Sequence, residues 1–137
     1  MTFDSVDDLL AAARADYERV TPAEAYERAA SGAVIVDIRP EWQRRAQGEI
    51  PGSVIVERNH LEWRLHPDSD ARLPFAVVGQ DWVVVCSEGY ASSLAAASLA
   101  ALGLTATDVV GGVVAWQEAG LPLVPGVTPV ESRVADR

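Results

Sequence analysis

Four short apolar runs divide the chain and predict buried strands. They span residues 33–36, 53–56, 82–85 and 108–110. All four are rich in valine and isoleucine, and none alternates clearly between apolar and polar residues. That pattern is typical of strands covered on both faces, as in a parallel sheet with helices on each side.

The segments around these runs have helical patterns. Apolar residues at helical spacing predict a helix over residues 5–17. Thr21-Pro22-Ala23-Glu24 is a capping box with proline at the first helical position, and it predicts a second helix that ends near residue 30. Strands and helices therefore alternate, which predicts an α/β fold. Further helices are expected over residues 40–47, 92–102 and 114–119.

The length of 137 residues suits a single domain. We expect an N-terminal helix within residues 1–20 and a domain over residues 21–124. Residues 125–137 carry proline, glycine and charge without periodicity, and we expect a flexible tail there. Trp42, in the third predicted helix, is expected in the core.

Composition narrows the function classes. The chain has one cysteine and two histidines, so neither an internal disulfide nor a four-ligand zinc site is expected, and we expect no metal or other cofactor. The net charge of −9 argues against nucleic acid as a partner. The acidic N-terminus does not resemble a signal peptide, and the most apolar stretch, residues 94–104, is too short for a membrane span. We therefore expect a cytoplasmic protein without a membrane partner.

Cys86 is the candidate for chemistry. It directly follows the apolar run 82–85, and a short loop with Gly89 leads from it to Ser92 and Ser93, which are expected to cap the next helix. Ligands of open α/β sheets bind at the carboxyl ends of the strands. Loop amides and a helix N-terminus there can cradle an anion and favour the thiolate over the thiol. The alternative is a small buried hydrophobic residue at a strand end.

Three segments, in order, resemble the rhodanese-like family over about residues 21–124. The family's loop pattern is Cys-x-x-Gly-x-Arg-Ser-like, upstream of it come Asp-x-Arg and Gly-His-Ile-Pro-Gly-Ala, and downstream comes Gly-Gly-x-x-x-Trp-x-x-x-Gly-x-Pro. This resemblance implies a mostly parallel, five-stranded sheet flanked by helices on both faces. The matching residues are Cys86-Ser87-Glu88-Gly89-Tyr90-Ala91-Ser92, Asp37-Ile38-Arg39 with Gly48-Glu49-Ile50-Pro51-Gly52-Ser53, and Gly111-Gly112-Val113-Val114-Ala115-Trp116-Gln117-Glu118-Ala119-Gly120-Leu121-Pro122.

The resemblance also implies an activity. It is the transfer of sulfane sulfur from thiosulfate or a persulfide donor to a thiol acceptor, through a persulfide on Cys86. The binding loop would be Ser87, Glu88, Gly89, Tyr90, Ala91 and Ser92. The partners implied are a small sulfur donor and a thiol acceptor, with a protein acceptor left open, and the chain is expected as a monomer or a homodimer.

Two positions depart from the family pattern. Ala91 stands where the family often has arginine, and Glu49 stands where it usually has a histidine that is a structural neighbour of the loop. Glu88 also places a carboxylate in the loop, which should repel a dianion. Thiosulfate is therefore expected to be a poor donor unless another side chain compensates. Arg58, after the second predicted strand, is the candidate for that role, with an exposed charge as its alternative. Trp63 is a candidate to line the mouth of the site.

Asp37 and Arg39 are expected to form a charged pair beneath the loop, as structural support. Two other functions stay open at this point. One is a non-catalytic rhodanese-like module for binding, regulation or redox sensing. The other is a phosphatase or arsenate reductase, whose loop requires arginine six residues after the cysteine. That position is Ser92 here, which argues against the second alternative.

Overall fold

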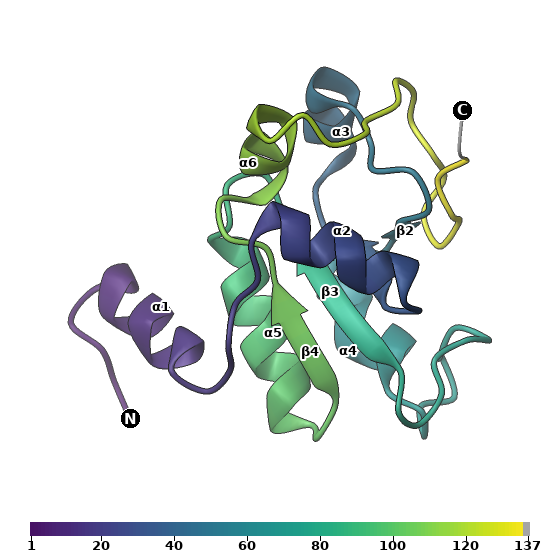
Figure 1. Cartoon of the computed structure of the whole chain (residues 1–137). Coiled ribbons are helices and arrows are strands. Elements are labelled where there is room, and N and C mark those ends of the chain that lie inside the picture. The colour runs from purple at the N-terminus through teal and green to yellow at the C-terminus, as the bar shows by residue number, and fades with distance from the viewer. Residues whose placement is uncertain (136–137) are drawn as a thin grey trace.

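The computed structural model describes residues 1–135 and contains a four-stranded parallel sheet (Figure 1). The strands lie side by side in the order β2-β1-β3-β4, so β1 and β3 are central. In register, Val36 of β1 lies opposite Val54 of β2 and Val84 of β3. The strands are β1 (Val34–Asp37), β2 (Val54–Ile55), β3 (Asp81–Val85) and β4 (Thr105–Asp108).

Six α-helices occur within the described residues, and the first, near the N-terminus, projects away from the sheet (Figure 1). The second begins as the sequence predicts, with the Thr21 side chain accepting from the N–H of Glu24 and the Glu24 carboxylate accepting from the N–H of Thr21. A 3-10 turn, η1 (Arg58–His60), precedes the fourth helix. The helices are α1 (Val6–Arg14), α2 (Pro22–Ala30), α3 (Glu41–Gln47), α4 (Leu61–Leu65), α5 (Ala91–Ala101) and α6 (Gly112–Glu118).

The core has two layers because successive residues of the central strands point to opposite faces. On one face, Val84 and its neighbours pack against α4 and α5, for example against Leu61 and Leu99. On the other face, Val83 and Val85 belong to a cluster with α2 and α6. Helices on both faces of a parallel sheet confirm the predicted α/β fold class, and both central strands are fully covered.

The sheet has four strands where the resemblance implied five. At the β4 edge, the chain before α2 contributes only a bridge, in which Val20 pairs with Val109. The last strand also lies earlier than the predicted run 108–110, because Thr105 and the next residues pair with β3 from Asp81 onward. Exposed threonine on this edge strand hides the apolar signal on which the prediction relied.

Trp42 corrects another expectation, since its side chain is 68% exposed rather than part of the core. The third helix instead turns Arg44 inward, where it pairs with Glu49. The inner face of this helix therefore carries a buried ion pair, where hydrophobicity alone predicts the tryptophan. Trp116 of α6 is buried and donates its indole N–H to the carbonyl of Pro122.

Residues 125–135, predicted as most of a flexible tail, lie along the β2 side of the molecule (Figure 1). Val134 is buried and its N–H donates to the carbonyl of Ser53, while Thr128 contacts the Glu49 carboxylate. Residues 136–137 of the predicted tail lie outside the described residues. The division into helix, domain and tail stays a prediction.

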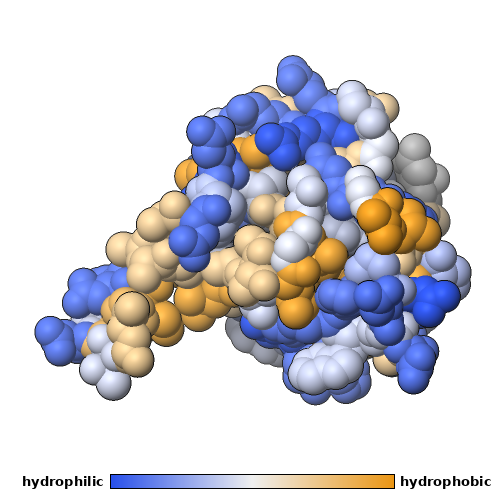
Figure 2. All heavy atoms as spheres, turned by 90° about the horizontal axis from the view of Figure 1, so that it is seen from below, coloured by the Kyte–Doolittle hydropathy of each residue, from blue (hydrophilic) through white to orange (hydrophobic). Residues whose placement is uncertain are grey.

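Figure 2 views the molecule from the end at which the strands begin. Hydrophobic atoms gather in the middle of this face, and hydrophilic atoms surround them. Among residues 1–135, no helix has both the length and the apolar character needed to cross a membrane.

Candidate active site

Cys86 follows the last residue of β3, a central strand, and its thiol is held by the loop that comes next. The side chain is 7% exposed. Its Sγ accepts hydrogen bonds from the backbone N–H groups of Gly89, at 3.2 Å, and Ser92, at 3.3 Å. Gly89 has φ of +89°, which turns its N–H toward the sulfur at a conformation that favours glycine. Two amide donors on one sulfur stabilise negative charge there.

A pocket of about 230 Å³ opens beside the sulfur. The Tyr90 ring, 59% exposed, forms part of its wall, and the exposed Glu88 places a carboxylate there. The lining carries no cationic side chain among the described residues, which sets the electrostatics of anything that enters. The lining residues are Gln43, Cys86, Ser87, Glu88, Tyr90 and Ala91.

Ser92 and Ser93 do not cap α5, contrary to the expectation from sequence. The helix begins after Tyr90, and no side chain caps it. Both hydroxyls are buried and donate instead to Oδ2 of Asp108, at 2.7 Å from Ser92 and 2.9 Å from Ser93. The Cys86 thiol in turn donates to the Ser92 hydroxyl oxygen at 3.2 Å. Both hydroxyls therefore bind a buried carboxylate on the neighbouring strand β4 instead of capping the helix.

Asp108 is the hub of this network. Its two oxygens also accept hydrogen bonds from the Tyr17 hydroxyl, at 2.7 Å, and from the Arg19 guanidinium, at 2.9 and 3.1 Å. Burial by itself would raise the pKa of Asp108, but the hydrogen bonds from Arg19, Tyr17 and Ser92 outweigh it and hold that pKa below its usual value. Burial raises the pKa of Tyr17. The site therefore contains an ionised carboxylate behind the loop.

Two arginines reach the loop from the N-terminal segment. Arg14 and Arg19 both donate to the backbone carbonyl of Gly89, at 2.7 and 3.0 Å. Burial would lower the pKa of Arg19, but hydrogen bonds to Asp108 and its charge outweigh burial and raise it. Sequence reasoning missed Arg14, Tyr17, Arg19 and Asp108, since no spacing rule connects an N-terminal helix to a loop about 70 residues later.

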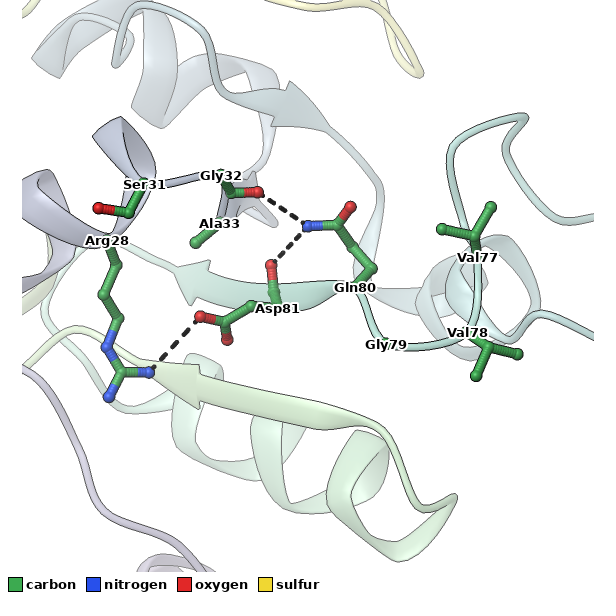
Figure 3. Close-up of a pocket in the computed structure, with 9 residues that line it drawn as sticks. All are labelled: Arg28, Ser31, Gly32, Ala33, Val77, Val78, Gly79, Gln80 and Asp81. Atoms are coloured by element: carbon green, nitrogen blue, oxygen red, sulfur yellow. Dashed lines mark hydrogen bonds and ion pairs between the residues drawn. The ribbon is translucent and has the colours of Figure 1, made fainter.

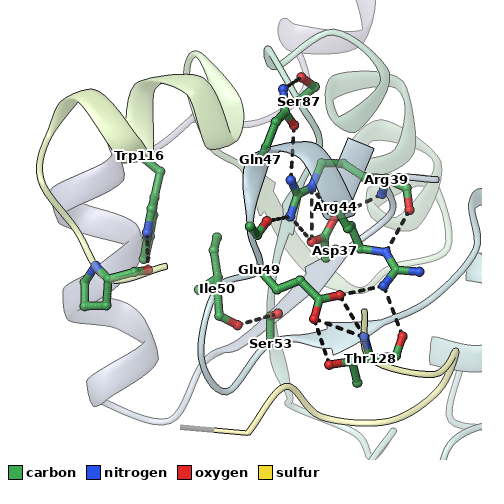
Figure 4. Close-up of polar contacts among 12 residues, drawn as sticks. Asp37, Arg39, Arg44, Gln47, Glu49, Ile50, Ser53, Ser87, Trp116 and Thr128 are labelled. Atoms are coloured by element: carbon green, nitrogen blue, oxygen red, sulfur yellow. Dashed lines mark hydrogen bonds and ion pairs between the residues drawn. The ribbon is translucent and has the colours of Figure 1, made fainter. Parts of the chain in front are cut away.

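On the other side of the loop lies the predicted pair of Asp37 and Arg39, which is fully buried (Figure 4). Arg39 donates to both carboxylate oxygens of Asp37, and also to the Gln47 side chain at 3.1 Å and the Gly48 carbonyl at 2.8 Å. The Gln47 amide then donates to the Ser87 hydroxyl at 2.7 Å. The pair thus touches the loop through one intervening side chain.

Arg58 and Trp63 line a different pocket, of about 1020 Å³, between α4 and α5. Arg58 donates to both oxygens of Glu62, and Trp63 is 61% exposed. Neither is among the residues that line the pocket at Cys86. Arg58 thus pairs with Glu62, one helical turn later, and makes no hydrogen bond or ion pair with the loop after β3 among the described residues.

A further pocket lies at the opposite end of the sheet, where β1 and β3 begin (Figure 3). It contains the ion pair of Arg28 with Asp81, at 3.8 Å, and the Gln80 amide, which donates to the Gly32 carbonyl. Among residues 1–135, no three or more histidine, cysteine, aspartate or glutamate side chains gather as metal ligands would. The single cysteine and the polar network around Asp108 lie together at the carboxyl end of β3, away from this pocket.

Comparison with known proteins agrees with this architecture. Residues 21–119 match the family model of the rhodanese-like domain. The thiosulfate sulfurtransferase GlpE of Ectopseudomonas mendocina (strain ymp) is 35% identical over 104 residues, which cover 74% of this chain and 86% of that protein.

Solved structures show the same likeness. A Rhodopseudomonas palustris protein, RPA3614, described as of unknown function and a "possible tyrosine phosphatase", is 33% identical with a TM-score of 0.80 over 90% of this chain and 97% of its own. A rhodanese-related protein of Thermoplasma volcanium is 28% identical with a TM-score of 0.63 over 79% of this chain and 98% of its own.

Proposed function

The chain belongs to the rhodanese-like domain family, and on that premise we propose that it is a sulfurtransferase that carries sulfur as a persulfide on Cys86. The observation that carries the proposal is the pair of backbone amides, from Gly89 and Ser92, that donate to the Cys86 sulfur at the end of a central strand. A thiolate is the nucleophile in sulfur exchange, and these donors favour it.

In the first step the Cys86 thiolate attacks the outer sulfur of a donor. With thiosulfate, a new bond forms between Sγ and that sulfur, the sulfur–sulfur bond of the donor breaks, and its electron pair leaves on sulfite. With a low-molecular-weight persulfide the leaving group is a thiolate. The product is a Cys86 persulfide anion, whose terminal sulfur can receive hydrogen bonds from the amides at the start of α5.

In the second step an acceptor thiolate attacks the terminal sulfur. The persulfide bond breaks, the electron pair returns to Cys86 as a thiolate, and the acceptor leaves as a persulfide. No net oxidation occurs, so no further reagent is needed. Two half-reactions through one covalent intermediate give ping-pong kinetics. The acceptor is a thiol, small or on a protein, that fits past the Tyr90 ring into the pocket of about 230 Å³.

The relative GlpE is a thiosulfate sulfurtransferase, which makes thiosulfate the first donor to test. The pocket lining here has Glu88 and no cation among the described residues. Like charges repel, so a persulfide with a single negative charge should enter more readily than the thiosulfate dianion. We therefore propose that thiosulfate is a slow donor and a persulfide a fast one.

A phosphatase function has less support, although RPA3614 is described as a "possible tyrosine phosphatase". Phosphoryl groups are usually clamped by arginine in a bidentate manner. Residues 87–92 contain no arginine, and the only acidic side chain among them is that of Glu88. A second negative charge beside a phosphate works against its binding.

Intact-mass spectrometry tests the proposal directly. Incubation with thiosulfate, or with a low-molecular-weight persulfide, should add one sulfur, about 32 Da, that cyanide or a reducing thiol removes. Cys86→Ser should gain nothing, since it is the only cysteine. If neither donor adds mass while iodoacetamide alkylates Cys86, the chain is instead a binding or redox-sensing module. Reversible oxidation of Cys86 by peroxide, followed in the same assay, would then support the redox alternative.

A further inference from the structure

The N-terminal segment lies before residue 21, where the match to the family model begins, yet it contacts the Cys86 loop. We infer that this segment is a working part of the active site, in which Arg14 and Arg19 supply the positive charge behind the loop that Ala91 does not, and Asp108 holds Arg19 in place. The inference deepens the proposed sulfurtransferase function and rests on Cys86 as its nucleophile.

Gly89 links the two sides of the loop. Its N–H donates to the Cys86 sulfur, while its carbonyl accepts from Arg14 and Arg19. A Cβ atom at Gly89 would come within 3.0 Å of Arg19 Nη2 and 2.9 Å of the Gly111 nitrogen. The guanidinium groups therefore pack directly against the residue that binds the sulfur.

Charge behind the loop does not cancel. Asp108 binds Arg19 through both of its oxygens, and this pair is close to neutral. Arg14 donates to Gly89 and to the Ser93 hydroxyl and lies over the Tyr90 ring at 6.0 Å from its centre. No carboxylate among residues 1–135 forms an ion pair with Arg14. Behind the loop, the positive charges of Arg14 and Arg19 therefore exceed the one negative charge of Asp108.

The other charges around Cys86 are weaker or paired. Glu88 adds a negative charge on the pocket side, but it is exposed, so solvent reduces its effect on the sulfur relative to the part-buried arginines behind the loop. On the β1 side, Asp37 and Arg39 neutralise each other. The charged and titratable groups that face Cys86 from the packed elements are thus Glu88 and Tyr90 of the loop, Asp37 and Arg39 of the β1 side, Asp108 of β4, and Arg14, Tyr17 and Arg19 of the N-terminal segment.

This arrangement predicts shifts of opposite sign for two substitutions. Arg19→Gln removes a cation and leaves the Asp108 carboxylate behind the sulfur, which disfavours the thiolate. Asp108→Asn removes the anion and leaves Arg14 and Arg19, which favours it. A purely structural role would change folding or the extent of reaction, without moving the two variants in opposite directions.

The rate of Cys86 alkylation by iodoacetamide, measured from pH 5 to 10 on the full chain, reads this out at the only thiol. The midpoint of the pH profile should rise by about one unit in Arg19→Gln and fall by about one unit in Asp108→Asn, which means about tenfold less or more thiolate below the midpoint. Arg19→Lys should restore much of the wild-type midpoint.

The ion pair of Arg28 and Asp81, at the other end of the sheet in Figure 3, provides matched controls. Arg28→Gln and Asp81→Asn change the net charge in the same way and should leave the midpoint unmoved. Circular dichroism and a thermal melt establish that each variant is folded. If Asp108→Asn does not fold, a rise in Arg19→Gln that Arg19→Lys reverses still supports the inference.

The inference is overturned if the folded Arg19 and Asp108 variants keep the wild-type midpoint or move in the same direction. It is overturned equally if the Arg28 and Asp81 variants shift as far. Alkylation needs no sulfur donor, so its outcome is separate from the proposed function. Opposite shifts in a protein that takes up no sulfur would uphold this inference and reject the sulfurtransferase.

Discussion

Gly112, at the start of α6, lies directly against the backbone carbonyl of Cys86. A Cβ atom at Gly112 would come within 2.5 Å of that carbonyl oxygen and of the Ser87 oxygen. The next two N–H groups of α6, those of Val113 and Val114, donate to the same two carbonyls at 2.9 and 3.0 Å. The loop is thus held at its base by a helix that carries none of the proposed chemistry.

Gly112→Ala should therefore damage the loop as well as the fold. The residue has φ of +60°, and the methyl group has no space, so we expect a loss of about 2 kcal/mol or more in urea unfolding. Sulfur loading of Cys86 should slow at temperatures where the variant is fully folded.

Gly120, just after the same helix, provides the control for this substitution. Its φ is +75°, but an added Cβ meets nothing within 4 Å. Gly120→Ala should cost about 1 kcal/mol from backbone strain alone and leave loading unchanged. Equal effects of the two substitutions on loading would contradict a specific role for the contact at Cys86.

Glu88 should limit the use of thiosulfate. It is exposed and lines the pocket, so its carboxylate repels a dianion through solvent. Glu88→Gln should lower the KM for thiosulfate about threefold to tenfold at low salt, with kcat little changed, and the gain should shrink as salt is added. Steady-state kinetics with cyanide as acceptor measure this.

The exposed Glu27 of α2 offers the same change of charge away from the pocket. Glu27→Gln should leave the KM for thiosulfate at its wild-type value. A KM that falls in both variants would point to the net charge of the protein rather than to a local carboxylate. A KM that falls in neither would mean that Glu88 does not limit the use of thiosulfate.

The buried pair of Asp37 and Arg39 should matter mainly for stability. Arg39→Met leaves the Asp37 carboxylate buried without its partner, which costs about 3–5 kcal/mol in comparable cases. Arg45 pairs with Glu41 at 3.4 Å on the surface, so Arg45→Met should have no measurable effect. Urea unfolding curves compare the two, and similar losses would contradict the structural role given to the buried pair.

Sequence patterns predicted the parts of this molecule that depend on local or repeated signals. The capping box at Thr21, the apolar strands around Val83 and the glycine loop after Cys86 all appear where the residues indicate. Edge strand β4 was misplaced because its threonine-rich start lacks the apolar signature. Trp42 was assigned to the core because hydrophobicity alone does not reveal that Arg44 finds a buried partner.

The hydrogen-bond network behind Cys86 could not be predicted from sequence patterns, because its members lie far apart along the chain. Arg19 and Asp108 are 89 residues apart, and each on its own looks like an ordinary surface charge. Only the fold brings the N-terminal segment beside β4, where Asp108 is fully buried. The position of Arg58 after a strand predicts a compensating charge at the site, but a pattern of strands does not reveal that Arg58 pairs with Glu62, one helical turn later.

Acid should destabilise the protein through the Glu49 carboxylate. Burial alone would raise the pKa of Glu49, but hydrogen bonds from Arg44 and Thr128 outweigh it and lower that pKa from the ordinary 4.5. A carboxyl whose pKa is lowered by folding adds stability above its unfolded pKa and loses it as the pH falls through the folded value. The free energy of unfolding should therefore be flat near neutral pH and decline below about pH 4.5.

Glu49→Gln isolates this contribution from that of Asp108, whose lowered pKa acts in the same direction from an ordinary value of 3.8. The variant should be less stable than the wild type at pH 7, because Arg44 is left buried without its partner. The difference between the two proteins should narrow as the pH falls from 5 toward 3, since protonation of Glu49 removes the same charge. Urea unfolding at a series of pH values measures both curves. A difference that stays constant over this range would mean that Glu49 is not the carboxylate that acid titrates.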